Sequence, residues 1–242
     1  MTYCVGVILE SGLVLASDSR TNAGVDQVGN YRKMTVFERT GDRVIVVLSS
    51  GNLAITQGVI ALLEQRAHMN QQNVWNSPSL YDVACLIGET LREVHKRDGP
   101  HLIHHNIDAS AGFIVGGQIG SERHRLFNIY TEGNFIEATP ETPFFQNGEI
   151  KYGKPILDRV ISYSTSLTEA AKCVLISFDS TMRSNISVGP PIDLLWYEQG
   201  SLRVGLQRRL RDHDSYFRKV RQQWGEGLKQ LFSELPDPYW ED

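Results

Sequence analysis

The sequence of 242 residues has few cysteines, no long apolar run and no strong excess of charge. Its three cysteines, Cys4, Cys85 and Cys173, are far apart and form no CxxC pair, which favours reduced thiols over a disulfide framework. No window approaches eighteen consecutive apolar residues, and no basic segment leads into an apolar one at the N-terminus. We therefore expect a cytoplasmic protein with neither a membrane span nor a secretory signal.

The charged and histidine-rich segments give no clear binding site. The net charge of −4 argues against general nucleic-acid binding, and the basic residues between 203 and 221 are interleaved with acids. That pattern favours a solvated or subunit-contacting surface. His101, His104 and His105 form HxxHH without cysteines or acids at ligand spacing, so a solvated loop after Gly99-Pro100 is favoured over a metal site. We expect neither a metal nor a cofactor.

The order of the expected elements indicates an α+β protein. Alternating apolar residues and turn signals predict strands, and helical spacing predicts helices. The expected strands span residues 3–9, 13–17, 31–37, 43–48, 109–119, 126–130, 134–138, 173–178, 192–197 and 201–206, and the expected helices span 53–67, 79–95, 154–163, 167–172 and 212–232. This order favours two antiparallel sheets stacked between helical layers, a four-layer αββα sandwich. Without repeats or a linker, residues 1–242 are predicted to form one domain with a C-terminal helix.

Thr2 directly follows Met1 and opens a strand-like segment. Removal of Met1 would leave a hydroxyl and a free α-amine on one residue. A hydroxyl is a weak nucleophile alone, whereas an α-amine with a pKa of about 7.7–8.0 can accept its proton near neutral pH. Thr2 could equally be an exposed second residue without a special function.

Asp18 and Lys33 stand at the ends of neighbouring expected strands. In an antiparallel meander these ends would return to one edge, near Thr2. A lysine held by an aspartate keeps its charge, and its positive field favours the unprotonated form of a nearby α-amine. The alternative is that Asp18 caps a turn and that Lys33 is a solvated residue of an edge strand.

Gly51 follows the strand 43–48 and precedes a helix. At such a position a backbone N–H can point toward a developing negative charge and act as an oxyanion-hole donor. The alternative is a simple turn glycine.

These residues, in this order, resemble the proteasome β-subunit and HslV group of N-terminal-nucleophile hydrolases, most closely the bacterial subset called Anbu. The segments that carry the resemblance are Thr2, 17–20, Lys33 and 50–54, together with 1–6, 17–24, 151–157, 179–185 and 188–193. The resemblance implies a threonine nucleophile at Thr2, electrostatic control by Asp18 and Lys33, and an oxyanion hole at Gly51.

Further roles come from the resemblance alone. It implies an acid and a serine near the threonine amine, assigned to Asp179 and Ser184 at the end of the expected strand 173–178. Arg20, Ser49 and Leu53 are implied to contact the substrate. One departure is that Asn147-Gly148-Glu149 stands where the group has a small hydroxyl, which puts catalytic efficiency or substrate type in question.

The resemblance also implies self-assembly into rings or spirals. The leading hypothesis is a self-assembling threonine peptidase or amide hydrolase that acts after Met1 removal. The alternatives are an assembly or scaffold protein with little peptidase activity, with unidentified partner proteins, and a small-molecule amidase with the same chemistry.

Overall fold

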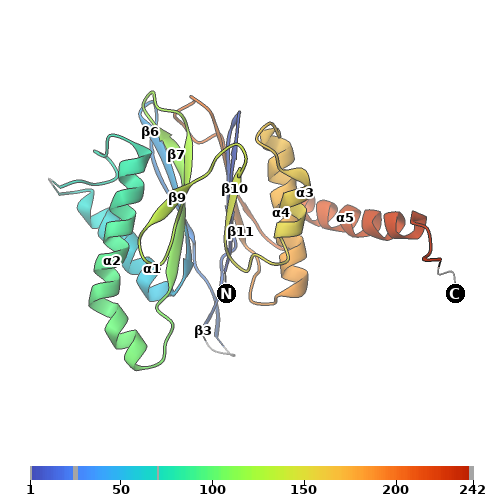
Figure 1. The fold of residues 1–242 in the computed structure, drawn as a ribbon, viewed down its shortest axis with the longest axis horizontal. Helices are drawn as coiled ribbons and strands as arrows, with labels where there is room; N and C mark the ends of the chain where they lie inside the picture. The colour runs from blue at the N-terminus through green and yellow to red at the C-terminus, as the bar shows by residue number, and fades with distance from the viewer. Residues whose placement is uncertain (1, 24–26, 70, 240–242) are drawn as a thin grey trace.

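The computed structural model describes residues 2–23, 27–69 and 71–239, in which two five-stranded antiparallel sheets lie face to face (Figure 1). The first sheet has the order β10-β1-β2-β11-β12. Its strands are β1 (Tyr3–Leu9), β2 (Gly12–Ser17), β10 (Phe144–Gly148), β11 (Ile192–Glu198) and β12 (Leu206–Leu210).

The second sheet has the order β5-β6-β7-β8-β9. Its strands are β5 (Met34–Arg39), β6 (Arg43–Gly51), β7 (Ala111–Ile119), β8 (Arg125–Ile129) and β9 (Phe135–Glu137). A separate hairpin, β3 (Arg20–Ala23) with β4 (Gln27–Asn30), links the two sheets in sequence. The expected meander of the first fifty residues is therefore wrong, because β1 and β2 belong to one sheet and β5 and β6 to the other.

Buried apolar residues form three clusters. The middle cluster lies between the sheets and contains residues such as Leu15, Leu48 and Ile114. Helices α1 (Leu53–Arg66) and α2 (Leu80–His104) cover the outer face of the second sheet. Helices α3 (Lys154–Val160) and α4 (Leu167–Ser184) cover the outer face of the first (Figure 1). The α+β prediction is confirmed, with both sheets antiparallel throughout.

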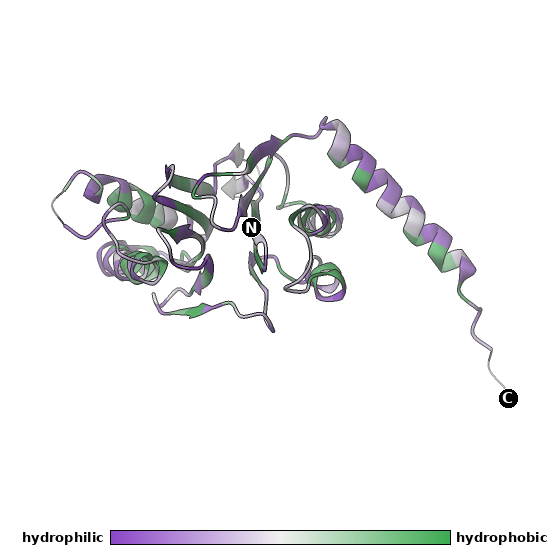
Figure 2. Ribbon diagram, turned by 90° about the horizontal axis from the view of Figure 1, so that it is seen from above, coloured by the Kyte–Doolittle hydropathy of each residue, from purple (hydrophilic) through white to green (hydrophobic). Residues whose placement is uncertain are grey.

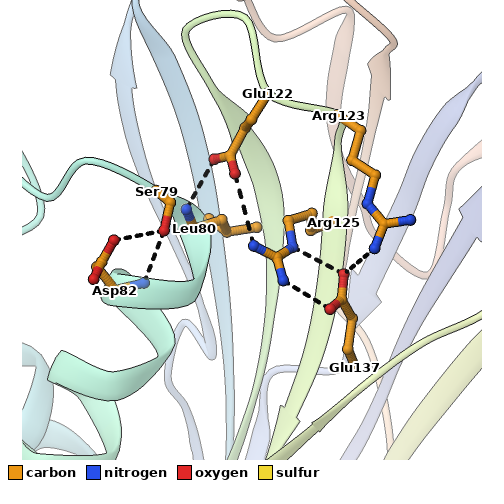
Figure 3. Close-up of polar contacts among 7 residues, drawn as sticks. All are labelled: Ser79, Leu80, Asp82, Glu122, Arg123, Arg125 and Glu137. Carbon is orange, nitrogen blue, oxygen red and sulfur yellow. Dashed lines mark hydrogen bonds and ion pairs between the residues drawn. The ribbon is translucent and has the colours of Figure 1, made fainter.

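A polar network attaches the start of α2 to the second sheet (Figure 3). Ser79 caps the helix through Asp82 N–H, and Glu122 accepts from Leu80 N–H at 2.8 Å. Arg125 on β8 holds Glu137 on the edge strand β9, with Nη2 and Oε2 2.7 Å apart. Because helix N-termini leave unpaired N–H groups, the Glu122 carboxylate satisfies a donor that would otherwise depend on water.

Helix α5 (Ser215–Glu234) projects away from the body of the molecule (Figures 1 and 2). Phe217, which is 1% exposed, anchors its first turn. Farther along, Leu231 and Phe232 are 57% and 78% exposed. These apolar side chains are thus not covered by the described residues of this chain.

Several sequence-based expectations need correction. Residues 173–178, expected as a strand, lie inside α4, whose capping box of Ser166 and Glu169 starts a helix that runs unbroken to Ser184. Helix α2 continues to His104 and His105 is its C-cap, so the HxxHH segment forms the end of a helix and not a loop. Strand β10 was not predicted, and β12 occupies 206–210 instead of 201–206.

Candidate active site

Thr2 lies one residue before β1 and is 7% exposed. Its carbonyl accepts a hydrogen bond from Glu149 N–H at 2.8 Å, which extends the β1–β10 pairing past Tyr3 and Gly148. Gly148 has a φ of +86°, and a Cβ there would lie 1.9 Å from the Thr2 carbonyl oxygen. A glycine is therefore required for β10 to approach Thr2 this closely. Met1 lies outside the described residues.

Asp18 and Lys33 form a buried ion pair beside Thr2. Lys33 Nζ lies 2.6 Å from Asp18 Oδ1, and the two residues are 5% and 0% exposed. The same carboxylate oxygen accepts from the N–H of Tyr3 at 3.0 Å, and Lys33 Nζ also donates to the Arg20 carbonyl at 2.7 Å. Burial raises the pKa of the Asp18 carboxyl, whereas the adjacent Lys33 ammonium opposes this shift. Because Asp18 accepts from every partner, its geometry fits a carboxylate.

Gly51 ends β6 with a φ of +96°, and a Cβ there would lie 2.3 Å from the Ser110 carbonyl oxygen. Ser49 N–H donates to the Lys33 carbonyl and Asn52 N–H to the Ser110 carbonyl, both at 2.8 Å. Backbone N–H groups alternate in direction along a strand. The N–H of Gly51 consequently points to the same side of β6 as that of Ser49, toward Lys33.

One cavity of about 770 Å³ connects these groups. Thr2, Lys33 and Gly51 all line it, as do two residues expected to contact the substrate, Ser49 and Leu53. The volume falls within the range of about 300–1,000 Å³ usual for ligand sites. Thr2, Lys33 and Gly51 are distant in sequence and were expected to lie together. They line the same cavity.

Solved structures with high similarity cover nearly the whole chain. Anbu (ancestral beta-subunit) from Yersinia bercovieri has a TM-score of 0.94 and 49% identity, over 99% of this chain and 100% of that chain. A structure titled "Helical Assembly of the Anbu Complex from Pseudomonas aeruginosa" gives 0.94 and 49%, over 98% of each chain. The chain belongs to the Anbu family.

A third structure, an Anbu (Gly-1) mutant from Hyphomicrobium sp. strain MC1, has a TM-score of 0.93 and 46% identity, over 99% of this chain and 100% of that one. No protein-family model matches the sequence, and the search of curated proteins found no match. The predicted resemblance to proteasome-like Anbu proteins is confirmed.

Asp179 and Ser184 are placed differently in this Anbu chain than expected. Both lie in α4 and not at the end of a strand, because the apolar segment before Asp179 is part of that helix. Asp179 is 1% exposed, and its Oδ1 accepts from Arg221 Nε of α5 at 2.7 Å. Ser184 is exposed at the last turn of the helix. The Asp179 carboxylate thus joins α4 to α5.

Arg20 contributes its backbone to the site and turns its side chain elsewhere. Its carbonyl accepts from Lys33, while its Nη1 donates to the Ile186 carbonyl at 2.6 Å. The guanidinium lies against Gly189, where an added Cβ would meet Arg20 Cζ at 2.3 Å. Gly189 N–H in turn faces Asp18 Oδ2 at 3.5 Å. Arg20 thereby supports the segment that covers Asp18.

Sequence reasoning missed Ile107 and Asp108, which line the cavity from the segment between α2 and β7. Asn52 Nδ2 donates to the Asp108 carbonyl at 2.8 Å across 56 positions of sequence, so no local pattern could indicate this contact.

In the described residues no helix is long and apolar enough to cross a membrane. The same residues contain no cluster of three or more His, Cys, Asp or Glu side chains suited to a metal ion.

Proposed function

We propose that this Anbu chain is a self-assembling hydrolase of peptide or amide bonds, with Thr2 as its nucleophile once Met1 has been removed. The observation that carries the proposal is the shared cavity of Thr2, Lys33 and Gly51, with Lys33 held at 2.6 Å by Asp18. A buried ammonium without a partner would cost several kcal/mol, and Asp18 offsets that cost. Asp179, whose carboxylate pairs with Arg221 of α5, and Ser184, which is exposed at the last turn of α4, have no role in this proposal.

The proposed reaction begins when the Thr2 α-amine takes the hydroxyl proton and Oγ bonds to the substrate carbonyl carbon. The N–H of Gly51 donates to the oxyanion that forms. The amide C–N bond then breaks, and the leaving amine takes the proton from the α-ammonium. Water, deprotonated by the same amine, attacks the acyl-enzyme ester, and the bond between carbon and Oγ breaks to release the acid and restore the hydroxyl.

Cys4, two positions after Thr2, is a poor alternative nucleophile. Cys4 is fully buried, and its Sγ lies 3.5 Å from the Ser49 carbonyl oxygen. Burial raises the pKa of the Cys4 thiol. Since the thiolate is the reactive form, the thiol of Cys4 is expected to be inert near neutral pH.

The decisive test is covalent labelling with a peptide β-lactone, followed by mass spectrometry of the N-terminal peptide. Wild-type protein without Met1 should gain one acyl group on Thr2, and Thr2→Ala should gain none. Thr2→Ser retains a hydroxyl and an α-amine and should still react. Equal labelling of the wild type and Thr2→Ala would refute the threonine mechanism.

Removal of Met1 is part of the same proposal, because only a terminal Thr2 has a free α-amine. Threonine is small enough at the second position for aminopeptidase trimming. Intact mass of the purified protein should show the loss of one methionine. A mass that retains Met1 under all expression conditions would contradict it.

A specific observation also favours assembly into a homo-oligomer. The exposed apolar residues of α5 have no cover in the described chain, and an apolar groove of about 430 Å³ lies beside the first turn of α5, lined by Leu175, Trp196 and Tyr216 among others. A second copy of this chain would cover such surfaces. The similar Pseudomonas protein is described as a helical assembly. Sedimentation at micromolar concentration should show a ring or spiral particle, whereas a clean monomer would contradict this.

We interpret residues 1–242 as one proteasome-like αββα domain, in which the three buried clusters separate four layers. The cavity volume also admits a small-molecule amide, which is the second candidate substrate. Side-by-side assays with unstructured peptides and with small amides distinguish the two. If only assembly is found, without labelling of Thr2, the scaffold hypothesis is favoured.

A further inference from the structure

Glu149 is a buried acid that the proposed mechanism leaves unused. The residue is 6% exposed, and its N–H donates to the Thr2 carbonyl at 2.8 Å. Its Oε2 accepts from Asn185 Nδ2 at 2.9 Å, at the end of α4. In register, Glu149 lies opposite Thr2, one step beyond the Tyr3–Gly148 pair.

A buried carboxylate needs a cation, and the hydrogen-bonded side chain here is a neutral amide. Glutamates are almost never this buried unless they are paired. Among the described residues, no lysine, arginine or histidine lies within ion-pair distance of Glu149. An Asn185 amide satisfies only one of the roughly four acceptor positions of a carboxylate. Processing would create a cation, the α-ammonium of Thr2, on the residue to which the Glu149 backbone is hydrogen-bonded.

We propose that Glu149 is a positioning residue that binds the α-ammonium of processed Thr2 and thereby delays its deprotonation to higher pH. The inference rests on the proposed role of this amine as general base. A carboxylate within about 4–6 Å stabilises a charged amine and raises its pKa by about 1–3 units. Nucleophilic attack needs the free amine, so the site would become reactive as the pH rises above neutrality.

Other charged groups around the amine act in both directions. Lys33 opposes protonation of the amine, while its partner Asp18 at 2.6 Å largely cancels that field at longer range. Asp108 faces the same cavity from the segment before β7. The carboxyl end of helix α4 carries a partial negative charge. The side chain of Arg20 donates to the Ile186 carbonyl. Of the acidic residues in this group, Glu149 is the one whose backbone N–H donates a hydrogen bond to the Thr2 carbonyl.

The amine can be titrated without any catalysis in a Thr2→Ala background, which retains the α-amine. Protein with Met1 removed is acetylated with acetic anhydride at each pH from 6 to 10. The acetylated fraction of the N-terminal peptide is quantified by mass spectrometry. Adding Glu149→Gln should lower the midpoint by about one pH unit or more. The matched control is Glu64→Gln, the same charge change at an exposed position of α1, which should leave the midpoint unchanged.

An unchanged midpoint in the Glu149→Gln protein, or an equal shift in the Glu64→Gln control, would overturn the inference. Glu149→Ser provides a second test should Glu149→Gln fold poorly, and it should shift the midpoint in the same direction. A purely structural role would change the yield of folded protein without moving the midpoint.

The hydrolase proposal is tested separately by β-lactone labelling of Thr2 Oγ in the natural background across the same pH range. Its rate should rise with pH in the wild type and reach its plateau at lower pH in Glu149→Gln. A shifted amine midpoint without labelling at any pH would support the inference and refute the hydrolase. Labelling of the wild type and of Glu149→Gln with the same pH midpoint would support the hydrolase proposal and refute the inference about Glu149.

Discussion

Asp18 and Asp179 are both almost completely buried, yet their cationic partners differ in burial. Lys33 is enclosed with Asp18, with 6% of its side chain exposed, whereas Arg221 is 35% exposed at the junction of α4 and α5. A fully enclosed pair fixes a charge in a cavity, where its field is strong. A half-exposed pair mainly holds two elements together, because solvent screens its field. The burial of the partner therefore separates a candidate catalytic acid from a structural one.

The largest expected effect is that of Asp18→Asn. This change leaves the Lys33 ammonium buried without its counter-charge, which should lower the free energy of unfolding by about 3–5 kcal/mol. Labelling of Thr2 should also be lost. Denaturant unfolding and β-lactone labelling measure the two effects.

The double variant Asp18→Leu with Lys33→Met sharpens this test. Removing both charges should recover most of the lost stability, since apolar replacements of buried ion pairs are often neutral. Labelling should stay absent. Recovery of labelling together with stability would show that the ion pair has no catalytic role.

Gly51→Ala should have the next largest effect. Its φ of +96° and the Ser110 carbonyl 2.3 Å from the new Cβ force β6 to move, at a cost of about 1–3 kcal/mol. Moving the N–H should slow labelling by about 10²–10³-fold. Gly41→Ala is the matched control, since Gly41 has a φ of +82° and nothing within 4 Å. Similar labelling rates for the two variants would argue against an oxyanion hole at Gly51.

Asp179→Asn should have the smallest effect. Losing a charged hydrogen bond to Arg221 should lower the free energy of unfolding by about 1–2 kcal/mol. The labelling rate of Thr2 should not change. Asp158→Asn, in the exposed pair with Lys154, is the control and should cost under about 0.5 kcal/mol. A large loss of labelling in Asp179→Asn would return this residue to the catalytic group.

The sequence predicts the first half of the fold better than the second. Strands near 3–17 and 43–48 and helix α1 are apolar segments bounded by glycine turns, so their positions follow from local signals. Residues 173–178 are apolar except for Ser177, and such a run fits a buried strand or a buried helix equally well. The capping signal at Ser166 and Glu169 favours one continuous helix, and extending it would have corrected the prediction.

The candidate site follows the same division. Thr2, Lys33 and Gly51 lie near the ends of predicted strands and share one cavity, although β1 belongs to one sheet and β5 and β6 to the other, and not to the expected meander. Asp179, whose role came from the resemblance, lies in α4 instead of at the end of the expected strand. Ile107 and Asp108 reach the cavity through tertiary packing, which carries no trace in the local sequence.

The position of Thr2 at the very start of β1 has a practical consequence for recombinant work. Any affinity handle fused ahead of Thr2 would turn its nitrogen into an amide, which cannot act as a base. Such a fusion would also have to leave a crowded sheet edge, because Thr2 is only 7% exposed. Under the proposed mechanism, protein prepared in that way would lack the free amine, and its inactivity would say nothing about the protein with an unblocked Thr2.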